Sequence, residues 1–236
     1  MRATTAAART TPSSRCSDPA FRTAAIAAVL WVATLAGCGG RQAATGAEPS
    51  RAPAPDSFLV EFETTRGRLV AMAHREWAPA GVDRFHTLVT RGYYDDARFF
   101  RVVRGFVAQF GLAADPARTD AWRGQSIPDD TVRTSNRRGT IAFARGGPAS
   151  RSTQLFINLR DNARLDTLNG FGFPPIAVIV DGLPLIDSLN AEYGEGPPRG
   201  TGPSQDSLRR QGNGYLDRSF PALDAIRRAR VTRVWR

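Results

Sequence analysis

The most informative part of this 236-residue sequence is the stretch FFRVVRGFVAQFG at residues 99–111. It consists of two short apolar runs on either side of Arg104-Gly105. Runs of β-branched and aromatic residues that are interrupted by glycine are typical of short strands. We therefore expect one strand at 97–103 and a second at 105–111.

The sequence on both sides continues this pattern. Residues 58–74 alternate between apolar and polar side chains and turn at Thr65-Arg66-Gly67, which indicates a β-hairpin. In the segment 75–95, Pro79 suits a first helical turn and the residues after it form one apolar face, which predicts a helix that stops at Gly92. Further elements are expected as strands at 139–145, 154–159, 176–180 and 229–235 and a short helix at 183–191. Many short strands with two helices indicate a closed antiparallel barrel or a sandwich, and the absence of βαβ alternation disfavours a Rossmann fold.

Three ordered blocks of the sequence resemble the cyclophilins, a family of peptidyl-prolyl cis-trans isomerases. The blocks are FFRVVRGFVAQFG (99–111), GTIAFARGGP (139–148) with STQLFI (152–157), and the segment from LD (165–166) through FPPI (173–176) to VDG (180–182). The likeness covers about residues 57–192 and the last strand. It implies a mainly β fold, an eight-stranded antiparallel β-barrel capped by two α-helices.

The resemblance also implies a site. Arg101 would be the catalytic residue, and Gln109 would hold it and meet the substrate carbonyl. The backbone of Ala144 and Arg145 would bind the peptide, with Gln154 as a secondary candidate at the wall. The apolar pocket for the proline ring would consist of Phe106, Val107, Phe156, Leu165 and Phe173. Without the resemblance, such apolar residues would be interpreted as core and the arginine as part of a solvated face.

The sequence departs from the family pattern at several positions. Arg104 stands where the family has a proline, Phe110 where it has a glycine, and Val107 where many members have a methionine. Arg164 replaces the tryptophan that contacts cyclosporin in the family, so we expect weak inhibition by that ligand. Arg101 itself is retained, and the implied activity is therefore not put in doubt.

Rotation about an X–Pro bond needs neither a nucleophile nor a proton transfer, because the transition state is a twisted amide. The chain is poorly supplied for hydrolytic triads or zinc sites, since it offers only His74 and His86, and Cys38 is expected to carry lipid. We expect no cofactor and no metal. The expected substrates are proline-containing polypeptides, and the alternative function is a non-catalytic chaperone module that binds proline-containing segments.

All 32 positive side chains are arginine, and the formal net charge is +10. Residues 38–206 nevertheless carry 20 arginines against 19 acidic residues, while the excess lies in residues 1–37 and 207–236. A nearly neutral middle of the chain with mixed signs is typical of a soluble surface rather than of a nucleic-acid groove. We expect a monomer that does not bind nucleic acid.

Residues 1–37 resemble a lipoprotein signal peptide. A basic leader precedes the apolar run TAAIAAVLWVATLA at 23–36, which is short for a membrane span, and Leu35-Ala36-Gly37-Cys38 resembles a bacterial lipobox. The alternative is a buried helix, or a chance occurrence of Leu-Ala-Gly-Cys. We expect Cys38 to be lipidated, residues 38–56 to form a flexible tether, and residues 57–236 to form an exported isomerase domain anchored to the outer or plasma membrane on its extracytoplasmic side.

The domain carries an insertion at about 193–228, before the last strand. Its apolar residues predict that it packs on the barrel: Leu208, Tyr215, Leu216, Phe220, Leu223 and Ile226. It is interpreted as a structural elaboration or, with its arginines, as a basic contact surface for anionic lipid or acidic protein.

Overall fold

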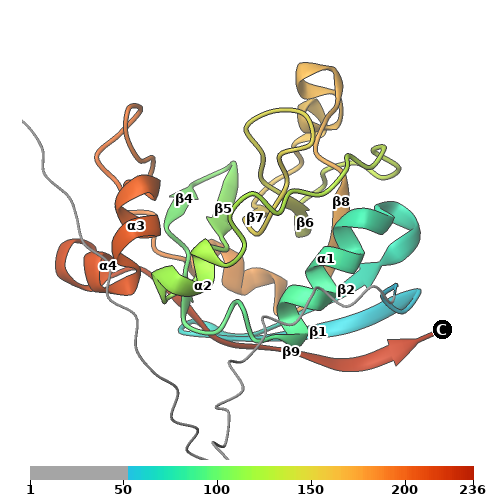
Figure 1. Cartoon of the computed structure of the whole chain (residues 1–236), viewed down its shortest axis with the longest axis horizontal. Helices are drawn as coiled ribbons and strands as arrows, with labels where there is room; N and C mark the ends of the chain where they lie inside the picture. The colour runs from blue at the N-terminus through green and yellow to red at the C-terminus, as the bar shows by residue number, and fades with distance from the viewer. Residues whose placement is uncertain (1–52) are drawn as a thin grey trace, which may run out of the picture. The chain divides into compact units, whose positions relative to one another are not determined.

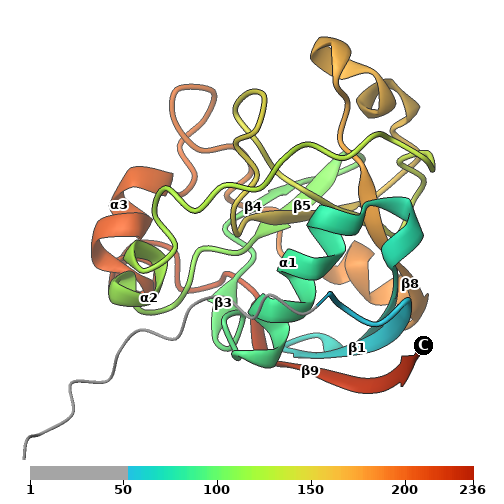
Figure 2. The same ribbon diagram turned by 45° about the vertical axis from the view of Figure 1, so that its right-hand side comes forward.

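The computed structural model describes residues 53–236, in which an antiparallel sheet of nine strands curls around an apolar core (Figures 1 and 2). The strand order is β3-β9-β1-β2-β8-β6-β7-β5-β4. The strands are β1 (Ser57–Thr64), β2 (Gly67–His74), β3 (Ala97–Arg98), β4 (Arg101–Val103), β5 (Val107–Phe110), β6 (Thr140–Phe143), β7 (Leu155–Asn158), β8 (Pro175–Asp181) and β9 (Ala225–Trp235). The expected mainly β, antiparallel architecture is confirmed.

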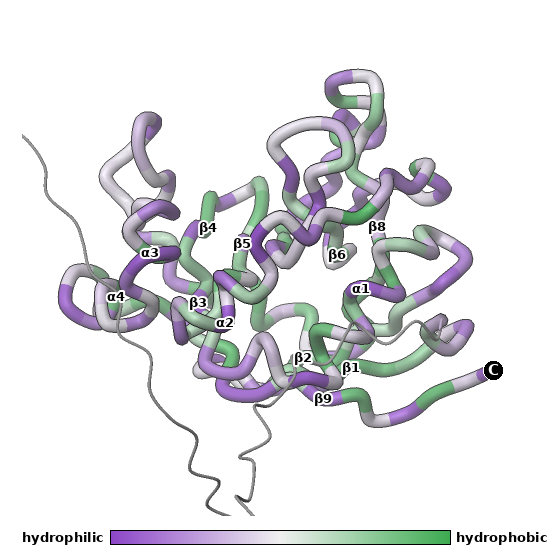
Figure 3. Tube along the Cα trace, viewed as in Figure 1, coloured by the Kyte–Doolittle hydropathy of each residue, from purple (hydrophilic) through white to green (hydrophobic). Residues whose placement is uncertain are grey.

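The three longest strands, β9, β1 and β2, lie next to one another in the sheet. β1 and β2 are the predicted hairpin, with Ser57 opposite His74 and Thr64 opposite Gly67. β9 lies antiparallel along the other side of β1, so the end of the domain pairs with its beginning. The buried residues alternate along β1, because one face of the hairpin covers the core. In Figure 3, β1 and β2 are largely hydrophobic, whereas α3 (Gln205–Gln211) is mostly hydrophilic.

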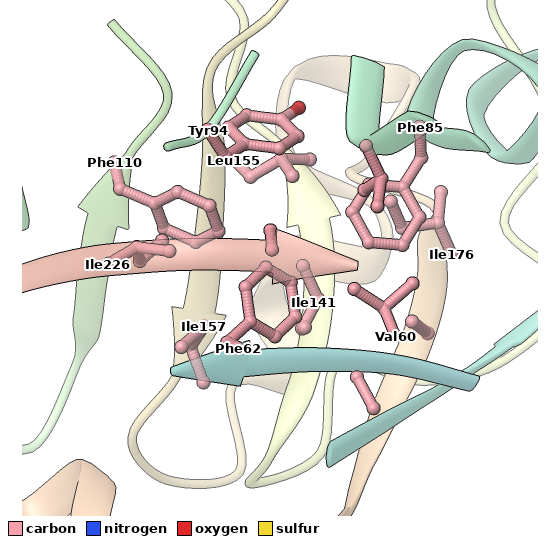
Figure 4. Close-up of a cluster of buried hydrophobic side chains, with 14 of the residues drawn as sticks. Val60, Phe62, Phe85, Tyr94, Phe110, Ile141, Leu155, Ile157, Ile176 and Ile226 are labelled. Atoms are coloured by element: carbon pink, nitrogen blue, oxygen red, sulfur yellow. The ribbon is translucent and has the colours of Figure 1, made fainter. Parts of the chain in front are cut away.

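Helix α1 (Pro79–Thr90) packs one face against the apolar core of this curled sheet and confirms the predicted helix. Its proline lies in the first turn, and the apolar side chains Val82, Phe85, Leu88 and Val89 are buried. The Asp130 carboxylate accepts hydrogen bonds from the free N–H groups of Ala80 and Gly81 at the helix start. Figure 4 shows Phe85 in the core among Val60, Phe62 and Ile176.

The strand expected at 97–103 is divided into β3 and β4, which accounts for nine strands instead of eight in the described residues. Phe99 and Phe100 between them are both buried, but Phe99 belongs to the main core and Phe100 to a second cluster that includes the insertion. Consecutive side chains of an extended segment point to opposite faces, so the two rings enter different clusters. Since β3 and β4 are the two end strands of the sheet, Phe99 and Phe100 connect its two ends.

The second helix differs from the expected one. Residues Leu183–Ser188 form a 3-10 helix, η4, and not an α-helix over 183–191. Gly182 before it has a left-handed conformation, and the Leu185 N–H donates to the Gly182 carbonyl three residues earlier. Such i to i+3 bonds define the tighter helix, which rarely extends beyond a few residues. Ile186 packs into the core.

The insertion packs on the domain, as its apolar residues predict, but the last strand begins at Ala225 and not at 229, so Ile226 belongs to β9 and the main core. It forms α3 and α4 (Asn213–Ser219), and α3 lies beside α2 (Pro116–Asp120) (Figure 2). Its cluster with the domain consists of Phe100, Leu112, Leu208, Leu216 and Leu223, with Tyr193, Tyr215 and Phe220 packed against them. The remaining short helices are η1 (Arg75–Trp77), η2 (Ala163–Asp166) and η3 (Leu168–Gly170).

The signal peptide expected at 1–37, the lipidation site Cys38 and most of the tether lie outside the described residues. The last tether residues are bonded to the domain: the Ala54 N–H donates to the Asp83 carboxylate, and the Asp56 carbonyl accepts from the Arg75 N–H. Within residues 53–236, none of the helices combines the length and apolar character that crossing a membrane requires.

Candidate active site

A pocket of about 880 Å³ opens where β4 and β5 face the insertion. Nine of the ten residues expected in the site line it: Arg101, Phe106, Val107, Gln109, Ala144, Arg145, Phe156, Leu165 and Phe173. The tenth, Gln154, lines an adjoining cavity of about 640 Å³ that shares Gln109, Ala144 and Arg145 with the first. The structure therefore brings the expected residues together, and their roles in the reaction stay predictions.

The floor of the pocket is apolar. Val107, Phe156 and Leu165 are buried, and Phe106 and Phe173 are partly buried against them. The rings of Phe156 and Phe173 meet edge to face, with centroids 5.7 Å apart and an interplanar angle of 70°. Such a concave apolar surface suits a small aliphatic ring such as that of proline.

The β4–β5 hairpin places the two polar residues of the site. Arg101 is directly opposite Gln109 in the ladder, and the turn between the strands contains Gly105 with a φ of 64°. The Arg101 Nη1 donates to Gln109 Oε1 over 3.2 Å, and the Gln109 Nε2 donates to Gln154 Oε1 over 2.8 Å. The Arg101 guanidinium lies 5.7 Å from the centroid of the Phe106 ring, at the edge of the apolar floor.

Glu195 is a site residue that the sequence did not indicate. It comes from the insertion, and its carboxylate accepts from Arg101 Nε over 2.7 Å and from Arg101 Nη2 over 2.6 Å. These hydrogen bonds hold the pKa of Glu195 below its ordinary value. The signal in the sequence was an acidic residue in the glycine-rich run Tyr193-Gly194-Glu195-Gly196, but nothing in that run relates it to Arg101, 94 residues earlier.

The side chain of Arg145 ties together the part of the pocket wall to which it belongs. The guanidinium pairs with the Asp129 carboxylate at 2.7 Å, donates to the Gly172 carbonyl and lies 3.9 Å from the centroid of the Phe171 ring. Burial lowers the pKa of Arg145. The N–H of the preceding Ala144 donates to the Gln154 carbonyl, so the carbonyl is the group that Ala144 retains for a bound peptide.

A buried network of side-chain amides fixes the rest of the pocket. Asn162 Nδ2 donates to the Phe106 carbonyl, and Asn136 Nδ2 donates to the Phe173 carbonyl, each over 2.9 Å. Asp166 Oδ1 accepts from the N–H and the Nδ2 of Asn136. Burial acts to raise the pKa of Asp166, but hydrogen bonds from Ser135 and Asn136 outweigh it and hold this pKa below its ordinary value. Two walls of the pocket therefore depend on asparagines that sequence reasoning missed.

The site can bind an apolar ring beside a fixed guanidinium. Arg101 is 17% exposed, which leaves its cation accessible to a ligand but largely shielded from bulk water. Charge-assisted hydrogen bonds are stronger in such surroundings than in water. The described residues contain no group of three or more histidine, cysteine, aspartate or glutamate side chains placed to hold a metal ion.

Comparison with known proteins agrees with this geometry. Residues 59–205 match the model of the family described as cyclophilin type peptidyl-prolyl cis-trans isomerase/CLD. Peptidyl-prolyl cis-trans isomerase B of Escherichia coli K12 is 32% identical over 136 residues, which are 56% of this chain and 83% of the relative. Isomerase cyp18 of Streptomyces antibioticus is 32% identical over 137 residues, 55% of this chain and 81% of the relative.

Two solved structures show the same fold. A cyclophilin-type peptidyl-prolyl cis-trans isomerase of Cryptosporidium parvum, determined in the presence of the dipeptide Ala-Pro, has a TM-score of 0.53 at 19% identity and covers 74% of this chain and 99% of its own. The cyclophilin AquaCyp293 of Hirschia baltica has a TM-score of 0.52 at 18% identity and covers 75% of each chain.

Proposed function

The chain belongs to the family of cyclophilin-type peptidyl-prolyl cis-trans isomerases, and on this premise we propose that it uses Arg101 to isomerise X–Pro bonds during the folding of exported proteins. Its activity is peptidyl-prolyl cis-trans isomerisation, and proline-containing peptides are its substrates. The observation that carries the assignment of Arg101 is its fixed guanidinium at the edge of an apolar pocket of about 880 Å³.

The reaction is slow in water because the C–N bond of the amide is partly double, which gives a barrier of about 18–20 kcal/mol. When the bond twists, the prolyl nitrogen loses its conjugation and regains a lone pair. A guanidinium N–H can donate to that lone pair only in the twisted state. An interaction that forms in the transition state and is absent in the ground state accelerates the reaction.

The other residues of the site would define which bond rotates. The ring of the substrate proline would bind on Phe156 and Phe173, and this contact would hold one side of the amide still. Gln109 would maintain the position of Arg101 and meet the substrate carbonyl. Rotation of the free, carbonyl side would then leave the nitrogen in place with its lone pair directed toward Arg101. No proton leaves, and no covalent bond forms or breaks.

The test is a proline-isomerisation assay on a short X–Pro peptide. Arg101→Ala should lower kcat/KM by about 100- to 1000-fold, the usual cost of removing one donor that stabilises a transition state. Arg104→Ala is the matched control, because Arg104 is an exposed arginine of the same hairpin that does not line the pocket. Full activity of Arg101→Ala would refute the assignment. Equal, spontaneous rates with wild type and Arg101→Ala would favour the non-catalytic binding module instead.

The location of the enzyme is also part of the proposal. The order of a basic leader, an apolar run and the sequence Leu35-Ala36-Gly37-Cys38 supports export and lipid attachment at Cys38. Acyl chains on that cysteine would tether the isomerase to the membrane on its extracytoplasmic side, where exported chains fold. Such an anchor would bring the activity next to its proposed substrates.

Mass spectrometry of the N-terminal peptide from cells that express the full gene tests the anchor. The expected peptide begins at an acylated Cys38, and Cys38→Ala should move the protein from the membrane fraction to the soluble fraction. An unmodified N-terminus that begins before Cys38 would contradict the proposal.

A further inference from the structure

The insertion reaches the predicted catalytic arginine directly. Glu195 accepts two hydrogen bonds from Arg101, at 2.7 and 2.6 Å, in a bidentate ion pair. The Arg101 side chain is 17% exposed and that of Glu195 is 29% exposed, so the pair is more shielded from solvent than a surface salt bridge. The parallel, forked geometry fixes both the position and the plane of the guanidinium.

The pair leaves Arg101 with donors for a substrate. A guanidinium has five N–H bonds. The Nε hydrogen and one Nη2 hydrogen point to Glu195, and one Nη1 hydrogen points to Gln109. One hydrogen on Nη1 and one on Nη2 therefore remain. Glu195 and Gln109 together hold the guanidinium from two directions and leave two of its N–H donors free. The ion pair therefore positions Arg101 without preventing it from binding a substrate.

The backbone around Glu195 is built to hold it in place. The Gly202 N–H donates to the Glu195 carbonyl over 2.9 Å. A Cβ atom at Gly200 would come within 2.3 Å of the same carbonyl oxygen, so this approach requires glycine. The neighbouring Tyr193 packs edge to face on Phe220, with centroids 5.1 Å apart, and its hydroxyl accepts from the Ala222 N–H.

The same insertion also packs against the start of β4, the strand that carries Arg101. Phe100, the residue before Arg101, is buried in one cluster with Leu208, Leu216 and Leu223 of the insertion. The insertion therefore contacts two consecutive residues: it packs on Phe100 through apolar side chains and pairs with Arg101 through Glu195. Both contacts reduce the freedom of the guanidinium relative to the pocket floor.

We propose that Glu195 is a positioning residue for Arg101, and that the insertion at 193–228 is thereby a working part of the active site. The proposal rests on the proposed function of Arg101. A long arginine side chain that is held by Gln109 alone samples several rotamers, and each unproductive rotamer withholds the donor from the twisting amide. Glu195 removes those rotamers before the substrate binds. Because preorganisation of this kind acts on the transition state, its loss lowers kcat and leaves KM nearly unchanged.

The experiment compares Glu195→Ala and Glu195→Gln with wild type in the X–Pro peptide assay. Glu195→Ala should lower kcat about 10- to 100-fold, the cost of misplacing a catalytic group, with KM within about twofold. Glu195→Gln keeps one acceptor oxygen, so its kcat should lie between that of wild type and that of Glu195→Ala. Glu192→Ala is the matched control, because Glu192 is an exposed acid of the same segment that does not line the pocket, and it should retain full activity.

A spectroscopic readout separates positioning from folding. In ¹⁵N–¹H NMR of the full domain, the paired guanidinium of Arg101 should give a sharp, downfield Nε–H signal, assigned by its loss in Arg101→Ala. Glu195→Gln should move and broaden this signal while the melting temperature stays close to that of wild type. An unchanged kcat, an unchanged Arg101 signal or a higher kcat in Glu195→Ala and Glu195→Gln would each overturn the proposal.

The activity of Arg101→Ala separates the positioning role of Glu195 from the catalytic role of Arg101. If Arg101→Ala is inactive and both Glu195 variants are fully active, the positioning role fails and the proposed function stands. If Arg101→Ala is itself fully active, the catalytic assignment fails and the role of Glu195 fails with it.

Discussion

Asn162 provides a sharp test of how the pocket is held together. Its side chain is 3% exposed, and its Nδ2 donates to the Phe106 carbonyl over 2.9 Å and to Asn158 Oδ1 over 2.8 Å. In Asn162→Ala, the Phe106 carbonyl keeps the hydrogen bond from the Leu159 N–H. The Asn158 oxygen, in a side chain with no exposure, loses the partner that Asn162 supplies.

The expected loss of stability follows from these two bonds. An unsatisfied buried acceptor costs about 1–3 kcal/mol, and the loss of an ordinary hydrogen bond costs about 0.5–1.5 kcal/mol. We therefore expect Asn162→Ala to lower the free energy of unfolding by roughly 2–4 kcal/mol. For a domain of this size, the melting temperature should fall by about 5–15 °C.

The assay is urea unfolding followed by tryptophan fluorescence, together with the X–Pro peptide assay at a temperature where the variant is folded. Since Phe106 lines the pocket, KM should rise when its carbonyl loses the hydrogen bond from Asn162. Asn213→Ala is the control, because Asn213 Nδ2 makes one exposed hydrogen bond to the Asp96 carbonyl and its loss should cost less than about 1 kcal/mol. If Asn162→Ala unfolds at the same urea concentration as Asn213→Ala, the reasoning about the buried network is refuted.

Three further predictions concern the insertion, the acid range and an inhibitor. Leu216→Ala, at a buried position of the insertion cluster, should destabilise the domain by about 2–5 kcal/mol in urea unfolding, and a cost below about 1 kcal/mol would mean that the insertion is not part of the folding unit. The lowered pKa of Asp166 means that its ionised carboxylate stabilises the fold above the ordinary carboxyl pKa, and that this stability is lost as the pH falls through the folded-state pKa. The difference in melting temperature between wild type and Asp166→Asn should therefore shrink on acidification. A difference that stays constant with pH would contradict this. Cyclosporin should inhibit weakly in a peptide-assay titration, because Arg164 replaces the family tryptophan and lies over Phe106 at 5.5 Å, and nanomolar inhibition would disprove the expectation.

The fold was predictable where the hydrophobic pattern of a segment matches the face that it buries in the core. Strand β1 and helix α1 each show one buried face, and the alternation or the 3.6-residue period that reports this face is present in the sequence. The divided strand at 97–103 was not predictable. Phe99 and Phe100 look like one apolar run, and only the position of the insertion decides that Phe100 has a second cluster to enter.

The site was predictable to the extent that it lies in the family blocks. All nine expected pocket residues that line the main cavity come from those blocks, since each block contributes a strand or loop next to the same pocket. Asn136 and Asn162 were missed because a buried amide that satisfies a carbonyl looks, in a sequence, like any loop asparagine. Burial, which gives these residues their importance, is not a local property of the sequence.

The all-arginine composition acquires a structural meaning from Glu195. Arg75 pairs with Asp83 through Nε and Nη2, Arg230 pairs with both oxygens of Asp95, and Arg101 binds Glu195 in the same forked way. A lysine could not make these bidentate contacts, because its ammonium is a single point of charge. On the exposed pairs the geometry adds little stability. At Arg101 the same geometry orients a group toward a substrate, so the value of an arginine–carboxylate pair in this protein is determined by the pocket beside it.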